Sequence, residues 1–519
     1  MSVLGFEALA LGALIVFVIF RLLKARPPLP PGPKPWPIIG NMLDVPTVRP
    51  WERYREWCDK YDSDVIFIQL PTLPMVILGS VKAATDLLEK RSQLYSDRRE
   101  SQMLKLMSFN NMLPSMPYDW NWRIHRRMFH QYFNQGTVDI FRPIQLQETR
   151  YFMARMLNSP EHTRNHIRHF ITSTIFSATY GKTILKMDDD YVTVAHAANS
   201  GLVLATIPGA FWVESMPFLK YIPSWMPGAG FKKFAAKYAP FIEQTRTKAY
   251  DETKQANENG IPRPSVANTM IEEIRTRYGD SEEGRDQEEI AKDVTGIAYG
   301  AGADTTASAV ESFLLAMDLF PEVQKRGQAE LDRVVGSQRL PEYEDLDEMP
   351  YIRAIMMETM RWMPVTAFGV PHAVTTDDEY QGYHIPKGAM VVANQWAMLH
   401  NPEDYPEPDQ FKPERFLDTD GNIDSSVRDP TTIAFGFGRR ICVGRYFSHN
   451  TLFICIASIL HAFNISAGVN AEGIPIKLVP EMTNGIVSKP KDVPTCLTPR
   501  SKAVAHLIEE AAMDLGLSA

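Results

Sequence analysis

The most informative stretch of this 519-residue sequence is Phe435-Gly436-Phe437-Gly438-Arg439-Arg440-Ile441-Cys442-Val443-Gly444. Its three glycines permit tight turns and close approach to a flat group, and an amphipathic helix is predicted to begin near Arg445. Backbone N–H groups of such a loop and of a helix N-terminus favour a thiolate over a thiol, and Arg440 adds positive charge. Cys442 is therefore a candidate axial ligand for a soft metal. The alternative is a buried, inert cysteine.

The composition excludes several classes of protein. Hydrophobic residues make up 45% and charged residues 22% of the chain, which indicates a globular protein with a large core rather than a disordered chain. The formal net charge is −8 and no long basic run occurs, so nucleic acid is not an expected partner. The 4 cysteines are too few and too scattered for a disulfide framework.

The N-terminus has the pattern of a membrane anchor. Residues 3–23 are almost wholly apolar, and Arg21, Lys24 and Arg26 form a positive flank that favours a cytosolic orientation for the rest of the chain. A cleaved signal peptide would have a basic segment before the apolar run, and none is present. We therefore predict a transmembrane anchor over residues 1–25, a proline-rich hinge over residues 26–40 acting as an extended spacer, and one domain over residues 41–519.

The remaining sequence predicts a mainly α fold with small peripheral β-sheets. Helical periodicity dominates from about residue 82 to residue 365. Helices are expected at 81–90, 118–133, 145–157, 166–180, 230–255, 286–319, 321–335 and 446–463, and strands at 64–70, 74–79, 380–385 and 390–393. Strands and helices do not alternate regularly, which argues against a doubly wound nucleotide-binding fold.

The stretch 435–444 resembles the haem-binding loop of the cytochrome P450 family, whose pattern is F-x-x-G-x-R-x-C-x-G. Phe435, Gly438, Arg440, Cys442 and Gly444 match every fixed position. The resemblance implies the cytochrome P450 fold and a haem b (iron protoporphyrin IX) cofactor. It further implies that Cys442 is the thiolate ligand to the iron, that Arg440 contacts a haem propionate and that Phe435 packs near the sulfur.

Further matches occur in the family's order along the whole chain. Residues 358–361 match E-x-x-R and residues 413–416 read P-E-R-F, which in the family form a buried structural ion-pair group. Trp122 and Arg126 match W-x-x-x-R and would share a helix face toward a haem propionate. His372 stands where family members often place a propionate-binding residue.

The longest predicted helix contains Ala301-Gly302-Ala303-Asp304-Thr305-Thr306. A dinucleotide motif is excluded because Thr305 stands where glycine is required and no strand precedes it. Glycine within a helix costs about 1 kcal/mol relative to alanine, and we expect its purpose here to be space above a flat cofactor. The stretch resembles the P450 oxygen-activation motif, which implies that Thr305 hydrogen-bonds bound dioxygen and that Asp304 supplies protons.

The resemblance implies a monooxygenase that inserts one oxygen atom from O2 into a small apolar substrate, a secondary metabolite or xenobiotic. Electrons would come from NADPH through a separate cytochrome P450 reductase, with cytochrome b5 as a further candidate donor. The chain is expected to be a monomer in the endoplasmic reticulum membrane, spanning it once with the catalytic domain in the cytosol. The alternatives are a haem-thiolate isomerase or dehydratase, or a non-catalytic haem protein.

Two features narrow the substrate. The chain resembles fungal microsomal members of the O-methylsterigmatocystin oxidoreductase-like kind, through Asp429-Pro430 and Val370-Pro371-His372-Ala373. By the same resemblance, mostly apolar segments at 101–117, 297–304, 366–370 and 482–487 would line the pocket. The aromatic, proline-broken segment 208–231 is predicted to be a loop at the membrane interface, with ordinary core packing as the alternative.

Overall fold

The computed structural model describes residues 27–470, 472–491 and 495–516. The predicted anchor over residues 1–25 lies outside them. None of the helices in the described ranges is both long and apolar enough to cross a membrane.

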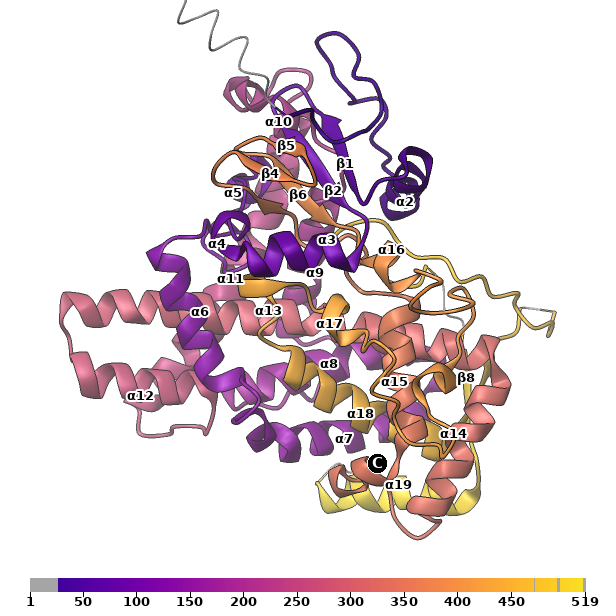
Figure 1. Cartoon of the computed structure of the whole chain (residues 1–519). Coiled ribbons are helices and arrows are strands. Elements are labelled where there is room, and N and C mark those ends of the chain that lie inside the picture. The colour runs from indigo at the N-terminus through magenta and orange to yellow at the C-terminus, as the bar shows by residue number, and fades with distance from the viewer. Residues whose placement is uncertain (1–26, 471, 492–494, 517–519) are drawn as a thin grey trace, which may run out of the picture.

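Helices form most of the molecule, as predicted, and a small sheet region lies at one end (Figure 1). The helices are α2 (Pro50–Tyr61), α3 (Val81–Ala84), α4 (Ser92–Tyr95), α5 (Gln102–Leu106), α6 (Trp120–Phe133), α7 (Arg142–Asn158), α8 (Thr163–Tyr180), α9 (Asp190–Ala205), α10 (Trp212–Ser215), α11 (Gly230–Glu258), α12 (Val266–Tyr278), α13 (Glu282–Leu319), α14 (Pro321–Val334), α15 (Pro350–Trp362), α16 (Gln395–Leu399), α17 (Thr431–Ala434), α18 (Arg445–Ala462) and α19 (Lys502–Asp514).

The strands form one four-stranded sheet and two hairpin-like pairs. The larger sheet has the order β1-β2-β6-β3, with β2 and β6 parallel and the other neighbours antiparallel. The strands are β1 (Val65–Gln69), β2 (Pro74–Leu78), β3 (His372–Ala373), β4 (Asp378–Tyr380), β5 (Tyr383–Ile385), β6 (Met390–Ala393), β7 (Phe463–Ala467) and β8 (Thr495–Pro499).

One local prediction was wrong. The single strand expected at 380–385 is a hairpin, because Gln381 (φ 53°) and Gly382 (φ 79°) turn the chain between β4 and β5. The helix expected at 81–90 is confirmed: it consists of α3 followed directly by a π-helical segment, Thr85–Lys90.

The proline-rich segment lies against the sheet over its described part. The carbonyl of Pro31 accepts the N–H of Phe67 in β1 (2.9 Å), and the carbonyl of Pro28 accepts the N–H of His384 in β5 (2.8 Å). A Cβ at Gly32 would lie 2.0 Å from the Phe67 oxygen, so only glycine permits this contact. The segment is extended, as its prolines require, and it is hydrogen-bonded to β1 and β5.

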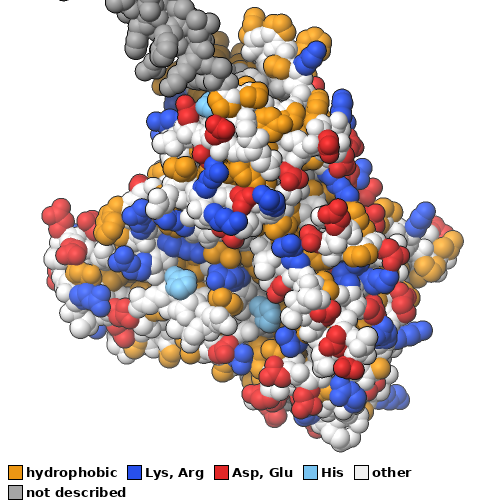
Figure 2. Space-filling view, viewed as in Figure 1, with side chains coloured by type: hydrophobic (Ala, Val, Ile, Leu, Met, Phe, Trp, Pro, Cys, Tyr) orange, Lys and Arg blue, Asp and Glu red, His pale blue; other side chains and the backbone are white. Residues whose placement is uncertain are grey.

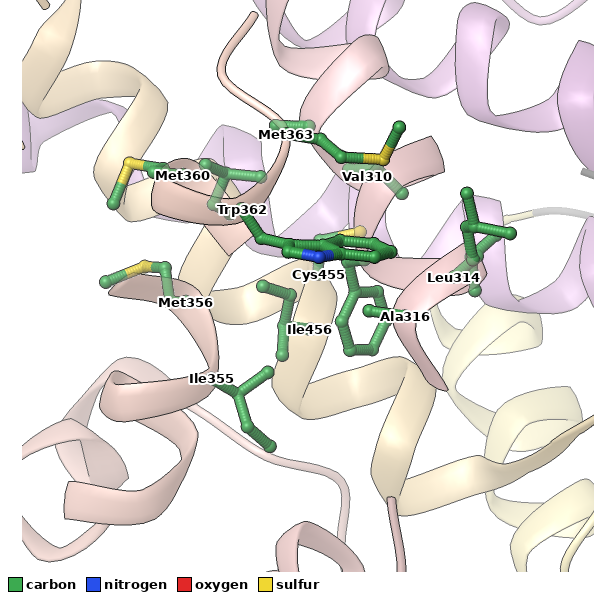
Figure 3. Packing of buried hydrophobic residues seen from close by; sticks show 14 of the residues in the cluster. Val310, Leu314, Ala316, Ile355, Met356, Met360, Trp362, Met363, Cys455 and Ile456 are labelled. Atoms are coloured by element: carbon green, nitrogen blue, oxygen red, sulfur yellow. The ribbon is translucent and has the colours of Figure 1, made fainter. Parts of the chain in front are cut away.

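Helix α13 is the central element and positions the rest. Its 38 residues span roughly 57 Å. It packs against α8, α11, α12, α6, α9 and α18, which explains why most of its residues from Ile290 to Met317 are buried. In Figure 3, Val310, Leu314 and Ala316 of α13 lie close to Trp362 of α15 and to Cys455 and Ile456 of α18, within one apolar cluster.

The ion-pair group predicted from the E-x-x-R and P-E-R-F motifs is present, and Glu358 and Arg361 lie near the C-terminal end of α15. Arg361 binds Glu358 through two nitrogens, at 2.7 and 2.9 Å, and both side chains are 0% exposed. The Glu358 carboxylate also accepts Arg415 Nε (3.2 Å) and the backbone N–H of Lys412 (2.8 Å). The group therefore ties α15 to the segment after α16, with two cations on one buried carboxylate.

Candidate active site

The cysteine loop lies between α17 and α18. Two of its glycines have positive φ, Gly436 at 80° and Gly438 at 58°, and a Cβ at Gly438 would lie 2.1 Å from the backbone oxygen of Leu88. The N–H of Cys442 donates to the carbonyl of Phe435 (2.9 Å), which closes the loop. The glycines therefore serve turn geometry and packing on the Thr85–Lys90 segment.

Cys442 differs sharply from Cys455. Cys455 is buried within the core cluster shown in Figure 3, surrounded by apolar side chains. Cys442 is exposed, yet enough protein surrounds it that burial raises the pKa of its thiol. The N–H groups of Gly444 and Arg445 and the charges of Arg126 and Arg445 oppose that rise. From the sequence, the N–H groups and arginines were expected to lower the pKa of Cys442 below that of a free thiol. The effect of burial is larger than theirs, because loss of hydration disfavours the thiolate.

A group of partly buried cations lies next to this loop. Arg440 donates to the carbonyls of Ser96 (2.7 Å) and Met116 (2.8 Å). Arg98 donates to the carbonyls of Pro114 (2.9 Å), Val370 (2.9 Å) and Pro371 (2.7 Å). Burial lowers the pKa of Arg440 to about 10, and burial and the charge of Arg440 lower that of Arg98 well below its usual range.

The other predicted propionate ligands join this group. The Arg440 guanidinium lies 4.4 Å from the centroid of the Trp122 ring, and Trp122 Nε1 is buried without a hydrogen-bond partner in the described chain. His372 Nδ1 pairs with the Tyr95 carbonyl (2.7 Å), and burial and the charges of Arg98 and Arg440 lower its pKa. Burial lowers the pKa of Arg126 to about 10, and the nearby Cys442 opposes that shift. We name Arg98, Trp122, Arg126, His372 and Arg440 the cationic cluster.

The cationic cluster has an excess of positive charge. Among the described residues, no Asp or Glu forms an ion pair with Arg98, Arg126 or Arg440. The nearby Asp97 carboxylate accepts the backbone N–H groups of Arg98 and Tyr118, both at 2.8 Å. Buried cations are normally matched by anions. The donor set therefore suits a bound group that carries carboxylates.

A cavity of about 400 Å³ lies against α13, and Arg98 of the cluster forms part of its wall. All four segments that were expected to line a pocket contribute to this cavity. Residues of α9 and of the segment before α10 also line it, and these were not predicted from the sequence. Ala301, Asp304 and Thr305 form part of its wall. Thr305 Oγ1 donates to the Ala301 carbonyl (3.0 Å), and Thr306 Oγ1 lies 3.2 Å from Ser448 Oγ in α18.

The helix glycines do not serve the purpose expected. A Cβ at Gly302 would lie 2.9 Å from Ile175 in α8, and a Cβ at Gly296 would lie 2.8 Å from the Arg246 Cα in α11. A Cβ at Gly300 would lie 3.3 Å from Thr245. These glycines let neighbouring helices approach α13, and Gly296 and Gly300 also line the cavity, beside Ala301 and Thr305.

Comparison with known proteins gives the family. The family model for cytochrome P450 matches residues 30–496. The chain is 40% identical to cytochrome P450 monooxygenase COX2 of Coprinopsis cinerea, over 93% of this chain and 91% of that protein. It is 38% identical to tryptamine 4-monooxygenase of Psilocybe cyanescens, over 96% and 98% of the two chains.

The chain therefore belongs to the cytochrome P450 family, and it is an oxidoreductase that incorporates oxygen. The family cofactor is haem with a cysteine thiolate ligand. The residues present fit this group: one cysteine lies in a glycine-rich loop, and beside it the cationic cluster provides an unpartnered indole N–H and excess positive charge for two carboxylates. Arg98 was missed because nothing in Ser96-Asp97-Arg98-Arg99 distinguishes the arginine that points inward.

Proposed function

We propose that this chain oxidises a small, neutral, apolar substrate with electrons delivered from NADPH by a separate reductase. When bound, haem supplies the oxygen activation, and the residues described above hold it and arrange its surroundings. Cys442 would be the iron ligand, Phe435 would pack beside it, and the cationic cluster would bind the propionates. Family membership and relatives named as monooxygenases favour this function over an isomerase or a ligand-binding role.

The observation that carries the substrate class is that four of the five charged residues of the cavity wall, all but Asp304, have protein partners. Arg98 donates to three carbonyls, and Arg99 donates to the Thr72 carbonyl (3.2 Å). Glu100 accepts Lys105 Nζ (3.2 Å), and Glu214 accepts Ser101 Oγ (2.7 Å) and the N–H of Met103 (2.8 Å). An ionic substrate would have to displace these partners, whereas an apolar one would not.

Asp304 and Thr305 would handle protons at the cavity wall. The Thr305 hydroxyl would hold a proton at the position where oxygen is reduced, and the Asp304 carboxyl would replace it. Their adjacency on α13 and their exposure to the cavity support these roles.

A reductase partner is supported by the surface near the cysteine loop. Figure 2 shows Lys and Arg side chains gathered over the region where Figure 1 places α3, α4 and α6. Arg123 and Arg127 of α6 are exposed. Such a surface attracts an acidic electron donor, a reductase or cytochrome b5.

We further propose that the protein is a single-pass monomer of the endoplasmic reticulum membrane, with anchor, hinge and domain divided at residues 25 and 40. The apolar run at residues 3–23 supports the anchor. The segment around α10 supports contact with the membrane: Trp212, Phe218, Tyr221 and Trp225 are each at least 63% exposed. Aromatic side chains of this kind settle at membrane interfaces.

The substrate class is tested with a matched pair of probes, ethylnaphthalene and naphthylethylamine, which is protonated at neutral pH. Binding is followed through the haem absorption of the purified holoenzyme, and turnover is measured with a microsomal NADPH–cytochrome P450 reductase. We expect ethylnaphthalene to bind at least about tenfold more tightly, because one unmet buried charge costs more than 1.4 kcal/mol, and to be hydroxylated. Tighter binding of the amine would contradict the proposed class.

A further inference from the structure

His125 of α6 lies between two residues of the cationic cluster in the sequence. Trp122 precedes it by three residues, and Arg126 follows it directly. The residue is buried, with 2% of its surface exposed, and its ring reaches α13, against which α6 packs (Figure 1). Buried polar atoms are normally hydrogen-bonded, so we expect both ring nitrogens to have partners.

Both ring nitrogens of His125 do have partners, and both partners are acceptors. Nδ1 lies 2.9 Å from the backbone carbonyl of Asn121, and Nε2 lies 3.2 Å from Asp293 Oδ2 of α13. A neutral imidazole has one N–H donor and one acceptor nitrogen, so it can satisfy only one of these contacts. The two contacts together therefore require a further proton, on the imidazole or on the Asp293 carboxyl group.

Helix α11 decides which group holds this proton. Arg246 Nε donates to Asp293 Oδ1 (2.5 Å), so the other oxygen of the same carboxyl group is bound to a guanidinium. Arg246 also binds the exposed Glu289 carboxylate (2.5 Å). A cation bound to a carboxyl group favours its ionised form, so the further proton belongs on His125. The result is a chain of alternating charges that joins α6, α13 and α11.

Asp293 lies on the face of α13 that also forms the cavity wall. Ile297, Gly300 and Asp304 follow it at intervals of four, three and four residues, which places all of them in one row along the helix. These three residues line the cavity. The contact between His125 and Asp293 therefore sets the position of α6 relative to the helix that forms this wall.

We propose that the His125 imidazolium, bound to Asp293, is a positioning residue that places Trp122 and Arg126 for haem binding. His125 acts through these two neighbours on α6, and the inference rests on the haem-binding roles proposed for them above. Without the ion pair, α6 would lose a buried attachment to α13. A shift of the Arg126 guanidinium would then weaken its hydrogen bonds, whose energy depends on distance and angle.

The first test measures haem release to excess apomyoglobin from the full-length holoenzyme. The proteins are wild type, His125→Leu, a cluster variant with Trp122→Phe and Arg126→Met, and the triple variant. His130→Leu is the control, because this histidine is exposed on the same helix. We expect His125→Leu to release haem about fivefold faster or more. In the triple variant it should add less than about twofold, because the residues it positions are already changed. The control should match wild type.

The second test observes the protonation of the His125 ring directly. In the reduced, CO-bound holoenzyme labelled with ¹⁵N-histidine, its signals are assigned by their loss in His125→Gln, which retains a donor toward Asp293. We expect both ring nitrogens to carry a proton at neutral pH in wild type. In Asp293→Asn one of them should lose it, because a neutral amide does not balance an imidazolium.

Three results would overturn the proposal, and they separate its possible failures. A single protonated nitrogen on His125 in wild type would contradict the imidazolium. Unchanged haem release from His125→Leu would contradict the positioning, and so would an equally large increase in the triple variant, since that is the behaviour of a merely structural residue. Normal haem retention in the cluster variant would instead refute the haem-binding roles on which the inference rests.

Discussion

Two groups of arginines in this molecule are balanced in different ways. Arg361 and Arg415 both bind the Glu358 carboxylate directly, so the first group has its anion within the chain. In the cationic cluster, Arg98 and Arg440 donate to carbonyls, and Arg440 also lies over the Trp122 ring. No carboxylate among the described residues forms an ion pair with the second group, which implies a bound anion.

The largest expected effect on stability comes from removing the Glu358 carboxylate, which Arg361 and Arg415 share. We predict that Glu358→Gln lowers the free energy of unfolding by about 3–5 kcal/mol, because it leaves Arg361 buried without an anion. The measurement is the urea midpoint of the purified holoenzyme, followed by circular dichroism. Glu52→Gln removes an exposed pair with Arg49 (3.2 Å) and should cost at most about 1 kcal/mol. Equal losses for the two variants would contradict the distinction.

The buried carboxyl of Glu148 extends the comparison to an anion, which forms no ion pair among the described residues. Burial raises the pKa of Glu148 from 4.5 to about 7, against the lowering effects of Ser173, of the Arg155 charge and of the hydrogen bond from Ser177 Oγ (3.3 Å). The folded state holds this proton more tightly, so its stabilising effect is complete below about pH 4.5 and is lost as the pH rises to 7, by up to about 3 kcal/mol.

We therefore predict that Glu148→Gln, which keeps the shape and cannot ionise, gains stability relative to wild type between pH 4.5 and pH 8. Urea midpoints of the holoenzyme at the two pH values give the result. A difference between variant and wild type that does not change with pH would show that Glu148 is matched in some other way.

The cationic cluster should respond differently from the Glu358 group. We predict that Arg98→Met weakens haem binding about tenfold or more, because a charge-assisted hydrogen bond contributes about 1.5–3 kcal/mol. Haem transfer from the holoenzyme to excess apomyoglobin measures this loss. Arg99→Met is the matched control, since Arg99 is only half-buried and donates to the Thr72 carbonyl. Equal haem loss from both variants would contradict the assignment of Arg98.

The sequence motifs point to residues that lie near one another in the structure, and the haem-binding role of each stays a prediction. The spaced motifs placed Cys442, Arg440, Trp122, Arg126 and His372 together, because each pattern fixes a residue type at a set distance along one element. Arg98 was missed because the side-chain direction in an irregular segment is set by distant contacts, here Pro114 and Pro371.

The role predicted for the glycines of α13 was wrong for a related reason. The glycines of α13 were expected to open space over the cofactor, and their actual contacts are with Ile175 and Arg246 on other helices. Such contacts join residues far apart in the sequence and leave no local pattern. The long helices, by contrast, were predicted well, because their periodicity is local.

The most direct test of the central claim is the absorption spectrum of the reduced protein with CO, measured for wild type, Cys442→Ala and Cys455→Ala. We predict the strongly red-shifted Soret band of thiolate ligation in wild type and in Cys455→Ala, whose cysteine lies in the apolar core, and loss of that band in Cys442→Ala. A red-shifted band that persists in Cys442→Ala would contradict this account of the site.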